Sequence, residues 1–477
     1  MGSALSWFCL APMASLWQRQ THRGALQSGW LFGLGIWLSS VWWLAEAAIS
    51  MGGAARPVAY ALVLVYCGYA AVPYALIGFL YSRYQLWNTG WGILALACGG
   101  AAILTLYPLP IPGYFIHGLH NDLIALQWLS IGGMPLLLVL VILVSLFTAN
   151  SRRSRYQACL VLLMMFMIYA GGYALKHVSQ KPAAAVLRVA AIQPNTQPER
   201  RSLASHQAVR LAAEQTLNFI QRKDVKADLI VWPELPIAMS YDDRSIDRQL
   251  FNDILQHTQI PWIINGYHNN DSASKTYRNR VWLLEPVGTY TAYDKQRLVP
   301  FGEYLPSTMQ WLAALLPDIK HYTPGVDHHN LSVNGWSIAT PICYEAIFPD
   351  LLNAQVASGA ALIINPGNDF WFHSPQASKI HLALARFRAI EQRRALLRVF
   401  NSGITTLILP SGEMHPASSP RNVEYEQLYP VPAHTKLSFY NRIASFLPFL
   451  CVFVGLGAAC YHKRMAINDP HLRKNTN

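Results

Sequence analysis

The sequence predicts a polytopic α-helical membrane part joined to a large extracytoplasmic α/β domain. The 477 residues are 52% hydrophobic and only 13% charged, whereas an average soluble domain has about 25% charged residues. Apolar segments of the ~20 residues needed to cross a bilayer fill the first part of the chain. A long stretch of ordinary polar content follows them, in which strand and helix patterns alternate, and this stretch is long enough for one complete domain.

Several apolar segments reach or approach the length of a membrane span. They are 28–48, 57–80, 90–107, 127–148, 157–175 and 443–461. We therefore expect a transmembrane domain over 1–175, a catalytic domain over 176–440, and a C-terminal transmembrane helix with a cytoplasmic tail over 441–477. Residues 1–17 are apolar but short, so a signal-peptide h-region, a re-entrant piece and a further span stay open. A membrane-embedded piece is the favoured interpretation.

Basic residues lie in short loops on one side of the alternating spans. They are Arg19, Arg23, Arg83, Arg152, Arg153, Arg155, Lys463 and Arg464. Because such loops face the cytoplasm, the large domain is expected on the other side, in the periplasm of a Gram-negative cell, with the spans in the inner membrane. Topology thus accounts for the net charge of +12, and no nucleic-acid partner is expected.

Within the large domain, β-rich runs alternate with helical patterns. The predicted strands are 186–193, 228–232, 262–266, 281–285, 337–343, 361–365 and 405–409, and the predicted helices are 203–222, 246–257 and 377–397. This alternation is typical of layered α/β folds, which place their functional sites at strand ends.

Of the seven cysteines, only Cys343 lies outside an apolar membrane-type stretch. It ends the strand-like run 337–343. The cysteines show no CxxC pair and no metal-ligand spacing, so neither a disulfide framework nor a zinc site is predicted. Cys343 is the natural candidate for a catalytic thiol.

A thiol attacks a carbonyl as the thiolate, so it needs a base and a donor that holds the developing oxyanion. Glu234, in Trp-Pro-Glu, and Lys295, in Tyr-Asp-Lys, each follow a predicted strand. Each residue has a structural alternative: Cys343 as a packing residue, Glu234 as a cap, Lys295 as a solvated loop residue. Their occurrence together in this order favours a base, an oxyanion stabiliser and a nucleophile.

The order of carboxylate, lysine and cysteine, each in its own motif, resembles the nitrilase, or carbon–nitrogen hydrolase, superfamily. The resemblance continues through Asn-Asp-Phe-Trp-Phe at 368–372 and Arg-Phe-Arg-Ala-Ile-Glu at 386–391. It implies an α-β-β-α sandwich and a Glu234, Lys295 and Cys343 triad. It implies neither an organic cofactor nor a metal.

Within that superfamily, Leu-Val-Pro-Phe-Gly-Glu-Tyr-Leu-Pro at 298–306 resembles the segment after the lysine in bacterial apolipoprotein N-acyltransferases. Gly-Trp-Leu-Phe-Gly-Leu-Gly at 29–35, with the Trp42-Trp43 pair, does so too. The resemblance implies a phospholipid acyl donor, a thioester on Cys343, and transfer to the N-terminal amine of a lipoprotein or lipopeptide. Glu303 would then be a second carboxylate that supports Lys295 or the intermediate. From the residues alone, Glu303 and Glu345 fit either active-site support or a structural salt bridge, and Tyr344 fits packing better than a supporting role.

Two other interpretations stay open. One is a membrane-tethered amidohydrolase acting on small amides or nitriles, for which the many spans would be superfluous. The other is an envelope protein of conjugal transfer, of the TraB type, which resembles this chain in architecture.

Two further clusters have plain structural explanations. The arginines Arg386, Arg388, Arg393, Arg394 and Arg398 fall in or beside the predicted helix 377–397. With Phe387, Ile390 and Leu397 turned inward, they are expected to form a solvated or ion-paired face. The pair His328 and His329 has no carboxylate or cysteine at metal-ligand spacing, so it is interpreted as loop.

Overall fold

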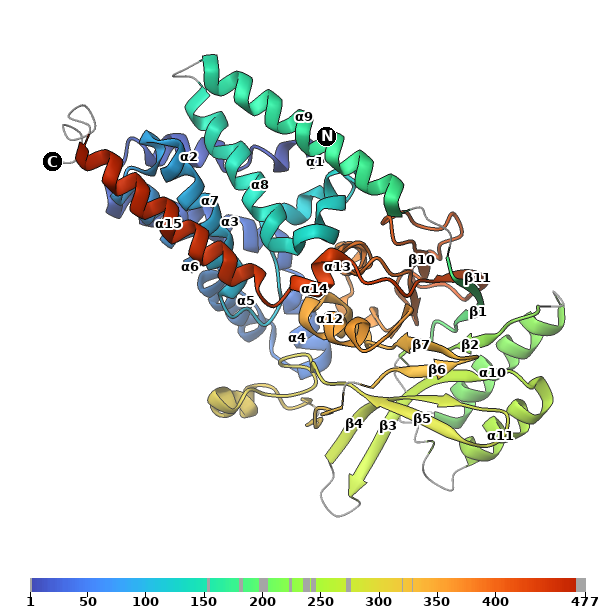
Figure 1. The fold of residues 1–477 in the computed structure, drawn as a ribbon. Coiled ribbons are helices and arrows are strands. Elements are labelled where there is room, and N and C mark those ends of the chain that lie inside the picture. The colour runs from blue at the N-terminus through green and yellow to red at the C-terminus, as the bar shows by residue number, and fades with distance from the viewer. Residues whose placement is uncertain are drawn as a thin grey trace. The chain divides into compact units, whose positions relative to one another are not determined.

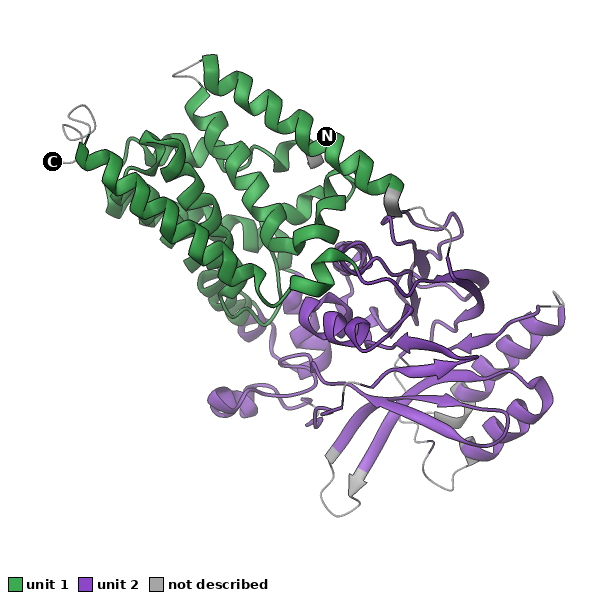
Figure 2. Ribbon diagram, in the orientation of Figure 1, with its two compact units in different colours: residues 1–42, 60–179, 438–477 green, residues 43–59, 180–437 purple. Residues whose placement is uncertain are grey.

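The computed structural model describes residues 2–151, 155–179, 183–196, 205–222, 225–234, 241, 246–271, 276–319, 321–327 and 329–468. The chain divides into two compact units, shown in Figure 2. Unit 1 comprises Met1–Trp42, Tyr60–Ser179 and Ser438–Asn477, and unit 2 comprises Trp43–Ala59 and Gln180–Leu437. The domain bounds expected from the sequence stay a prediction.

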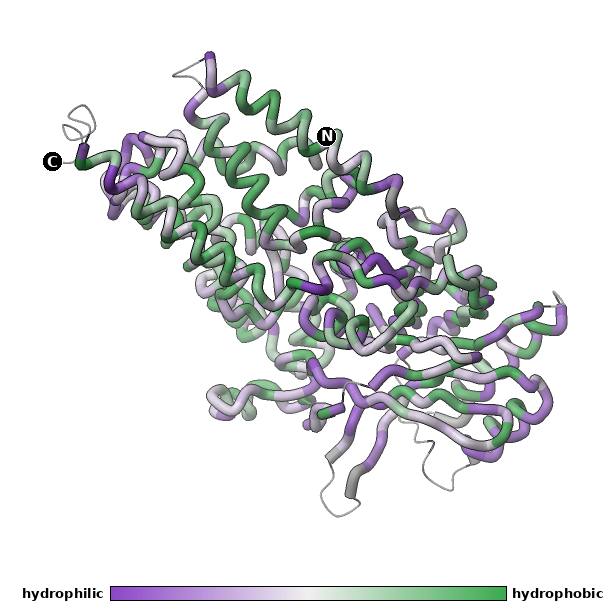
Figure 3. Tube along the Cα trace, in the orientation of Figure 1, coloured by the Kyte–Doolittle hydropathy of each residue, from purple (hydrophilic) through white to green (hydrophobic). Residues whose placement is uncertain are grey.

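Unit 1 is built from helices in the described part of the chain. They are α1 (Gly2–Ser6), α2 (Ala11–Trp17), α3 (His22–Val41), α5 (Arg56–Ala70, whose first turn falls in unit 2), α6 (Val72–Arg83), η1 (Leu86–Asn88), α7 (Gly90–Leu106), η2 (Phe115–Leu119), η3 (Ala125–Trp128), α8 (Leu129–Ser151), α9 (Arg155–Ser179), α14 (Phe439–Ile443) and α15 (Leu447–Asn468). Helix α3 packs on α6, and α7 packs on both α8 and α15. Figure 3 shows hydrophobic residues along most of α8 and in the middle of α9, with hydrophilic residues near both ends of α9.

Four described helical stretches are long and apolar enough to cross a membrane. They are Arg56–Arg83, Ala125–Ser151, Arg155–His177 and Leu447–Asn468, and a fifth results if α3 and the bent helix after it form one span. Gly90–Leu106 and Ala4–Trp17 are apolar but shorter. The chain therefore has several apolar helices of the kind that forms a membrane part.

Unit 2 contains two sheets with helices on their outer faces (Figure 1). The six-stranded sheet has the order β11-β1-β2-β3-β4-β5 and the five-stranded sheet the order β10-β9-β8-β7-β6. The strands are β1 (Ala185–Gln193), β2 (Leu229–Val231), β3 (Trp262–Asp271), β4 (Thr276–Leu284), β5 (Tyr290–Asp294), β6 (Leu331–Val333), β7 (Trp336–Ala339), β8 (Leu362–Gly367), β9 (Leu396–Phe400), β10 (Thr406–Ile408) and β11 (Tyr425–Ala433). The helices are α4 (Leu44–Gly52), α10 (Ser205–Arg222), α11 (Ile246–Thr258), η5 (Ser307–Leu315), η6 (Cys343–Ile347), α12 (Pro349–Ala357), η7 (Phe370–Phe372) and α13 (Pro375–Gln392).

The apolar side chains of unit 2 fill three layers. Alternate residues of a strand point to opposite faces, so Val189 of β1 faces the other sheet, while Ile192 faces α10 and α11. Residues of both sheets form the central layer, and α12 and α13 cover the outer face of the five-stranded sheet. The predicted α-β-β-α sandwich is confirmed. The predicted site residues Glu234, Lys295 and Cys343 come after strands of unit 2, namely β2, β5 and β7.

The predicted span 28–48 is not one helix, because α3 and α4 are separate and belong to different units. The ring of Trp43, just before α4, meets that of Phe372 edge-on at 4.9 Å between centroids. The Ser50 hydroxyl donates to the carbonyl of Trp371 at 2.8 Å. Helix α4 is thus an apolar segment that packs within unit 2, against η7, and its apolarity alone did not distinguish it from the preceding helix.

All seven predicted strands are present, with their bounds shifted by a few residues. Four more strands, β5, β6, β9 and β11, were not predicted. Strand β11 contains Pro430 and Pro432 and lies at an edge of its sheet, where a missing N–H is tolerated. Of the predicted helix 203–222, the part from Ser205 onward forms α10, and its first residues lie outside the described part of the chain.

The predicted helix 377–397 was wrong at its C-terminal end. Helix α13 ends at Gln392, because the next residue, Arg393, adopts the left-handed φ of 52° and the chain re-enters the sheet as β9. The predicted solvated arginine face was also wrong, because four of the five side chains are buried. They are Arg386, Arg388, Arg394 and Arg398.

Protein oxygens replace water around two of these arginines. Arg394 donates to the carbonyls of Ala360 and Lys436, at 2.7 and 2.8 Å. Arg388 pairs with Glu391 at 2.9 Å. The long side chains therefore brace the five-stranded sheet, and the ion-paired part of the expectation holds for Arg388.

Candidate active site

Cys343 lies in a tight turn that follows β7. The parallel pairing of β7 with β8 ends at Ala339, so the predicted strand end at Cys343 was too long, and Cys343 begins η6. Its φ of 51° falls in the left-handed region, which is costly for a residue other than glycine. The side chain is 6% exposed, and its Sγ lies 3.9 Å from the Asn368 carbonyl.

Glu345 ties this turn to the loop that follows β5. Its carboxylate accepts the N–H of Ile342 at 2.7 Å, the N–H of Gln296 at 2.6 Å and the N–H of Arg297 at 3.0 Å, and it accepts the Tyr293 hydroxyl at 3.0 Å. Burial raises the pKa of Glu345 to about 7, against the effect of the N–H donors. Glu345 therefore braces the nucleophile turn through backbone contacts.

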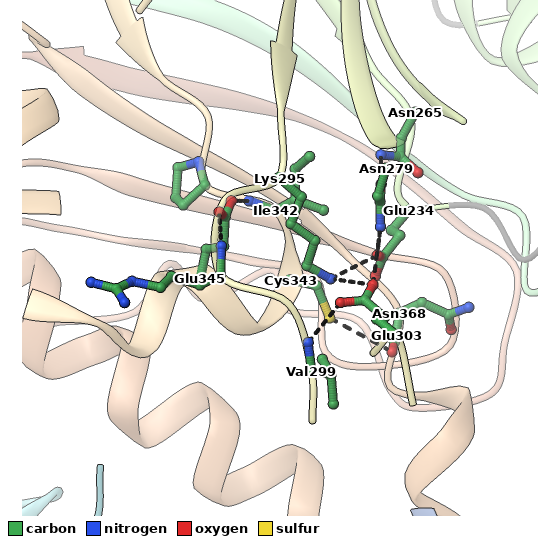
Figure 4. A network of polar contacts seen from close by, with 12 residues as sticks. Glu234, Asn265, Asn279, Lys295, Val299, Glu303, Ile342, Cys343, Glu345 and Asn368 are labelled. Carbon is green, nitrogen blue, oxygen red and sulfur yellow. Dashed lines mark hydrogen bonds and ion pairs between the residues drawn. The ribbon is translucent and has the colours of Figure 1, made fainter. Parts of the chain in front are cut away.

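Glu234, Lys295 and Glu303 form one buried ion cluster. The Lys295 ammonium lies 2.8 Å from Glu303 Oε1 and 3.3 Å from Glu234 Oε1. Lys295 follows β5, and its own N–H donates to the Asn279 carbonyl at 2.8 Å. Figure 4 shows that the ammonium, both carboxylates and the Cys343 sulfur point toward one another. Glu234, Lys295 and Cys343, which the sequence places in three separate motifs, therefore lie together in one site.

Two asparagines complete this cluster, and sequence reasoning missed both. The Asn279 amide donates to Glu234 Oε1 at 2.7 Å and to Glu303 Oε1 at 3.3 Å. Asn265 donates to the Asn279 side-chain oxygen at 2.8 Å, so that the Asn279 NH₂ group faces the carboxylates (Figure 4). Both lie in paired strands, where asparagine is disfavoured. A buried polar residue in an apolar strand was the signal that could have found them.

The charges of this cluster act on the thiol. Burial raises the pKa of Cys343 well above its ordinary value, the Glu234 carboxylate raises it further, and the Lys295 ammonium opposes this only in part. Burial by itself lowers the pKa of Lys295, but Glu234, Glu303 and Cys343 outweigh it, so that pKa stands well above its ordinary value. At neutral pH the site therefore holds a thiol and an ammonium, and the thiol needs a base to become a nucleophile.

The remaining predicted site residues are placed as follows. The Glu303 Oε2 atom accepts the Val299 N–H at 2.8 Å, which fixes the turn that carries it. The Tyr344 ring is half-buried and packs edge-on against Phe348 at 4.8 Å. Of the predicted loop pair, His329 is an exposed loop residue, and His328 lies outside the described residues. Among the residues described, no group of three or more His, Cys, Asp or Glu side chains is placed to hold a metal ion.

Comparison with known proteins gives two matches to protein families that together cover most of the chain. Residues 3–147 match the apolipoprotein N-acyltransferase N-terminal domain, and residues 188–428 match the carbon-nitrogen hydrolase family. Apolipoprotein N-acyltransferases of Azotobacter vinelandii and Pseudomonas putida are 31% and 30% identical to the chain. The aligned regions cover 82% of this chain and 78% and 79% of theirs. The protein of that name from Geobacter metallireducens is 26% identical, over 94% of this chain and 89% of its own length.

Two solved structures show similarity to about half of the chain. A carbon-nitrogen hydrolase from Helicobacter pylori is 14% identical and has a TM-score of 0.39, covering 56% of this chain and 94% of its own. An amidase from Nesterenkonia is 17% identical and has a TM-score of 0.41, covering 55% of this chain and 95% of its own.

Proposed function

The chain belongs to the apolipoprotein N-acyltransferase family of carbon–nitrogen hydrolases, and from this premise we propose that it moves an acyl chain from a phospholipid, through a thioester on Cys343, to the N-terminal amine of a lipoprotein. The observation that carries the proposal is the buried cluster in which Lys295 bridges Glu234 and Glu303 beside the thiol. It holds one base, one cation and one nucleophile, which is the equipment that acyl transfer needs.

In the first half-reaction, Cys343 Sγ attacks the ester carbonyl carbon of the phospholipid. Because the pKa of Cys343 is raised, its thiol needs a base to lose its proton, and Glu234 takes that proton. The carbonyl oxygen becomes an oxyanion, and the Lys295 ammonium stabilises it. When the C–O bond breaks, the lysophospholipid alkoxide receives the proton from Glu234, and the acyl group stays on sulfur as a thioester.

In the second half-reaction, the α-amine of the lipoprotein attacks the thioester carbonyl. Glu234 takes the amine proton, the C–S bond breaks, and the thiolate is reprotonated as the amide is released. The two substrates never need to bind at once, so ping-pong kinetics are expected. The chain's several apolar helices suit an acyl donor that resides in a membrane.

Glu303 supports the lysine in this proposal. Lys295 is 1% exposed, and an unpaired ammonium at such a site would lose its proton easily. With Glu303 Oε1 at 2.8 Å and Glu234 Oε1 at 3.3 Å, its charge persists through both half-reactions. Asn279 donates hydrogen bonds to both carboxylates, which lessens the repulsion between their negative charges.

The proposal is tested by incubating the purified protein with phospholipid and searching by mass spectrometry for an acyl thioester on Cys343, followed by addition of a diacylated lipopeptide. We expect a thioester that disappears as the lipopeptide becomes N-acylated. A thioester that only hydrolyses would indicate a membrane-bound hydrolase. Absence of any thioester would contradict the proposal and favour the small-amide hydrolase or the conjugal-transfer protein.

A periplasmic catalytic domain and an inner-membrane location also belong to the proposal, since the basic loops predict them. With Cys159 and Cys460, the exposed native cysteines, replaced by serine, a cysteine is introduced either at Val287 or at Ser154. Val287 is 83% exposed in the β4–β5 turn. In intact spheroplasts, a membrane-impermeant thiol reagent is expected to label the Val287→Cys variant, and the Ser154→Cys variant only after lysis. The reverse pattern would overturn the topology.

A further inference from the structure

His381, on α13, faces oxygen atoms with both ring nitrogens. Its Nδ1 lies 2.9 Å from Asp369 Oδ1, and its Nε2 lies 3.2 Å from the carbonyl oxygen of Cys343. The side chain is buried, at 7% exposure, and the rings of Phe372 and Phe400 meet it edge-on at 6.3 and 5.3 Å. His381 therefore connects a buried carboxylate directly to the backbone of the nucleophile.

Asp369 is held as a carboxylate. Burial by itself raises its pKa, but His381 and Arg398 outweigh burial, so the pKa lies below its ordinary value. Arg398 is fully buried, with Nη2 3.8 Å from Asp369 Oδ2, and its guanidinium stacks over Phe400 at 3.8 Å. The charged and titratable groups that meet around His381 are thus Asp369 of the loop before η7, Arg398 of β9 behind it, and Cys343 of η6.

Both ring nitrogens of His381 face oxygen atoms that accept hydrogen bonds, because a carboxylate and a carbonyl oxygen have no proton to donate. The ring of His381 therefore ties the Asp369 carboxylate to the Cys343 carbonyl.

The Cys343 carbonyl has a second donor, the Asn365 amide at 3.2 Å. Two donors from different elements, α13 and β8, hold one carbonyl, and because the peptide is planar they fix its orientation. That peptide adjoins the left-handed Cys343, whose conformation persists only if its surroundings impose it. We propose that His381, oriented by Asp369, holds the Cys343 carbonyl and thereby positions Cys343 for attack.

His381 is thus a positioning residue, and its test uses three enzymes. His381→Gln keeps a neutral N–H donor, His381→Leu keeps volume without a donor, and His257→Gln makes the same change at an exposed histidine of α11 as a control. On the proposed function, the rate of thioester formation per folded site falls about 10²-fold in His381→Leu with KM unchanged, the cost of misplacing a reacting group. His381→Gln recovers part of the loss, and His257→Gln matches the wild type.

The rate per folded site separates positioning from a plain packing role. If His381→Leu lowered the melting temperature but left the rate of thioester formation per folded site unchanged, His381 would have a packing role only. If His381→Gln recovered none of the lost rate, the hydrogen bond to the Cys343 carbonyl would not be what positions the thiol. Either result overturns the proposal.

One readout remains valid even if the phospholipid gives no thioester. Alkylation of Cys343 by iodoacetamide does not require the thiol to be aligned with an ester. We therefore expect the alkylation rate to change less than 10-fold in His381→Leu, whereas the rate of acyl transfer falls about 10²-fold. A larger loss of alkylation would mean that the turn itself has collapsed.

Discussion

Replacing Cys343 with serine is expected to abolish the thioester and with it acyl transfer, a fall of about 10⁴-fold or more in kcat, since loss of the nucleophile removes most of the rate enhancement in acyl-transfer enzymes. The hydroxyl is a much weaker acid than the thiol, and the Glu234 carboxylate is too weak a base to activate it. The measurement is the appearance of N-acylated lipopeptide together with mass spectrometry of the peptide that contains residue 343.

Folding should survive this change. The Cys343 Sγ makes one weak contact, at 3.9 Å to the Asn368 carbonyl, and the strained turn is held by Glu345 rather than by the sulfur. The melting temperature of Cys343→Ser is therefore expected to stay close to that of the wild type. Cys460→Ser, at an exposed cysteine, is the matched control and should keep full activity. A fully active Cys343→Ser enzyme would refute the assignment of the nucleophile.

Replacing Glu234 with glutamine is expected to lower kcat by about 10² to 10⁴-fold, the contribution of a positioned general base. The same change should lower the pKa of Cys343. Burial is the main cause of that raised pKa, and the Glu234 carboxylate is the next, so removing the negative charge makes the thiolate easier to form. The variant should thus react faster with iodoacetamide at pH 8 while it transfers acyl groups far more slowly.

The measurement is the alkylation rate of Cys343 against pH, whose midpoint should move to lower pH in Glu234→Gln. In Glu234→Gln, Lys295 stays paired with Glu303 at 2.8 Å, so the buried ammonium keeps a counter-charge and folding should persist. Glu424→Gln, at an exposed carboxylate, is the control. A midpoint that moves to higher pH, or does not move, would contradict the placement of Glu234 beside the thiol.

Much of the site could be predicted because its motifs are local. A few residues were enough to recognise each motif: a carboxylate after Trp-Pro, a lysine after Tyr-Asp and a cysteine in an apolar run. In the structure, Glu234, Lys295 and Cys343 lie in one cluster. Asn279 and His381 were not found. Each is a single polar residue in an otherwise ordinary strand or helix, and its partners are distant in sequence.

The errors arose where local pattern and tertiary environment disagree. The run 377–397 has helical spacing to its end, yet parallel pairing with β8 takes Leu396 onward into the sheet. Arginine is usually a surface residue, and both Arg394 and Arg398 were expected there. Instead, backbone carbonyls surround Arg394, and Asp369 and an aromatic ring lie beside Arg398. The helical period and the charge of a segment are local properties. They do not indicate which residues elsewhere in the chain will bury that segment.

The sequence by itself determined the division into an apolar helical part and an α/β part, seven of the strands, and the three residues that we propose as nucleophile, base and cation. These follow from hydrophobic period and residue chemistry, which are properties of short segments. Only the tertiary structure decided that α4 packs within unit 2, that Asn279 contacts both carboxylates, and that His381 contacts the Cys343 carbonyl. Those contacts join residues far apart in the chain, and their geometry exists only once the sheets have packed.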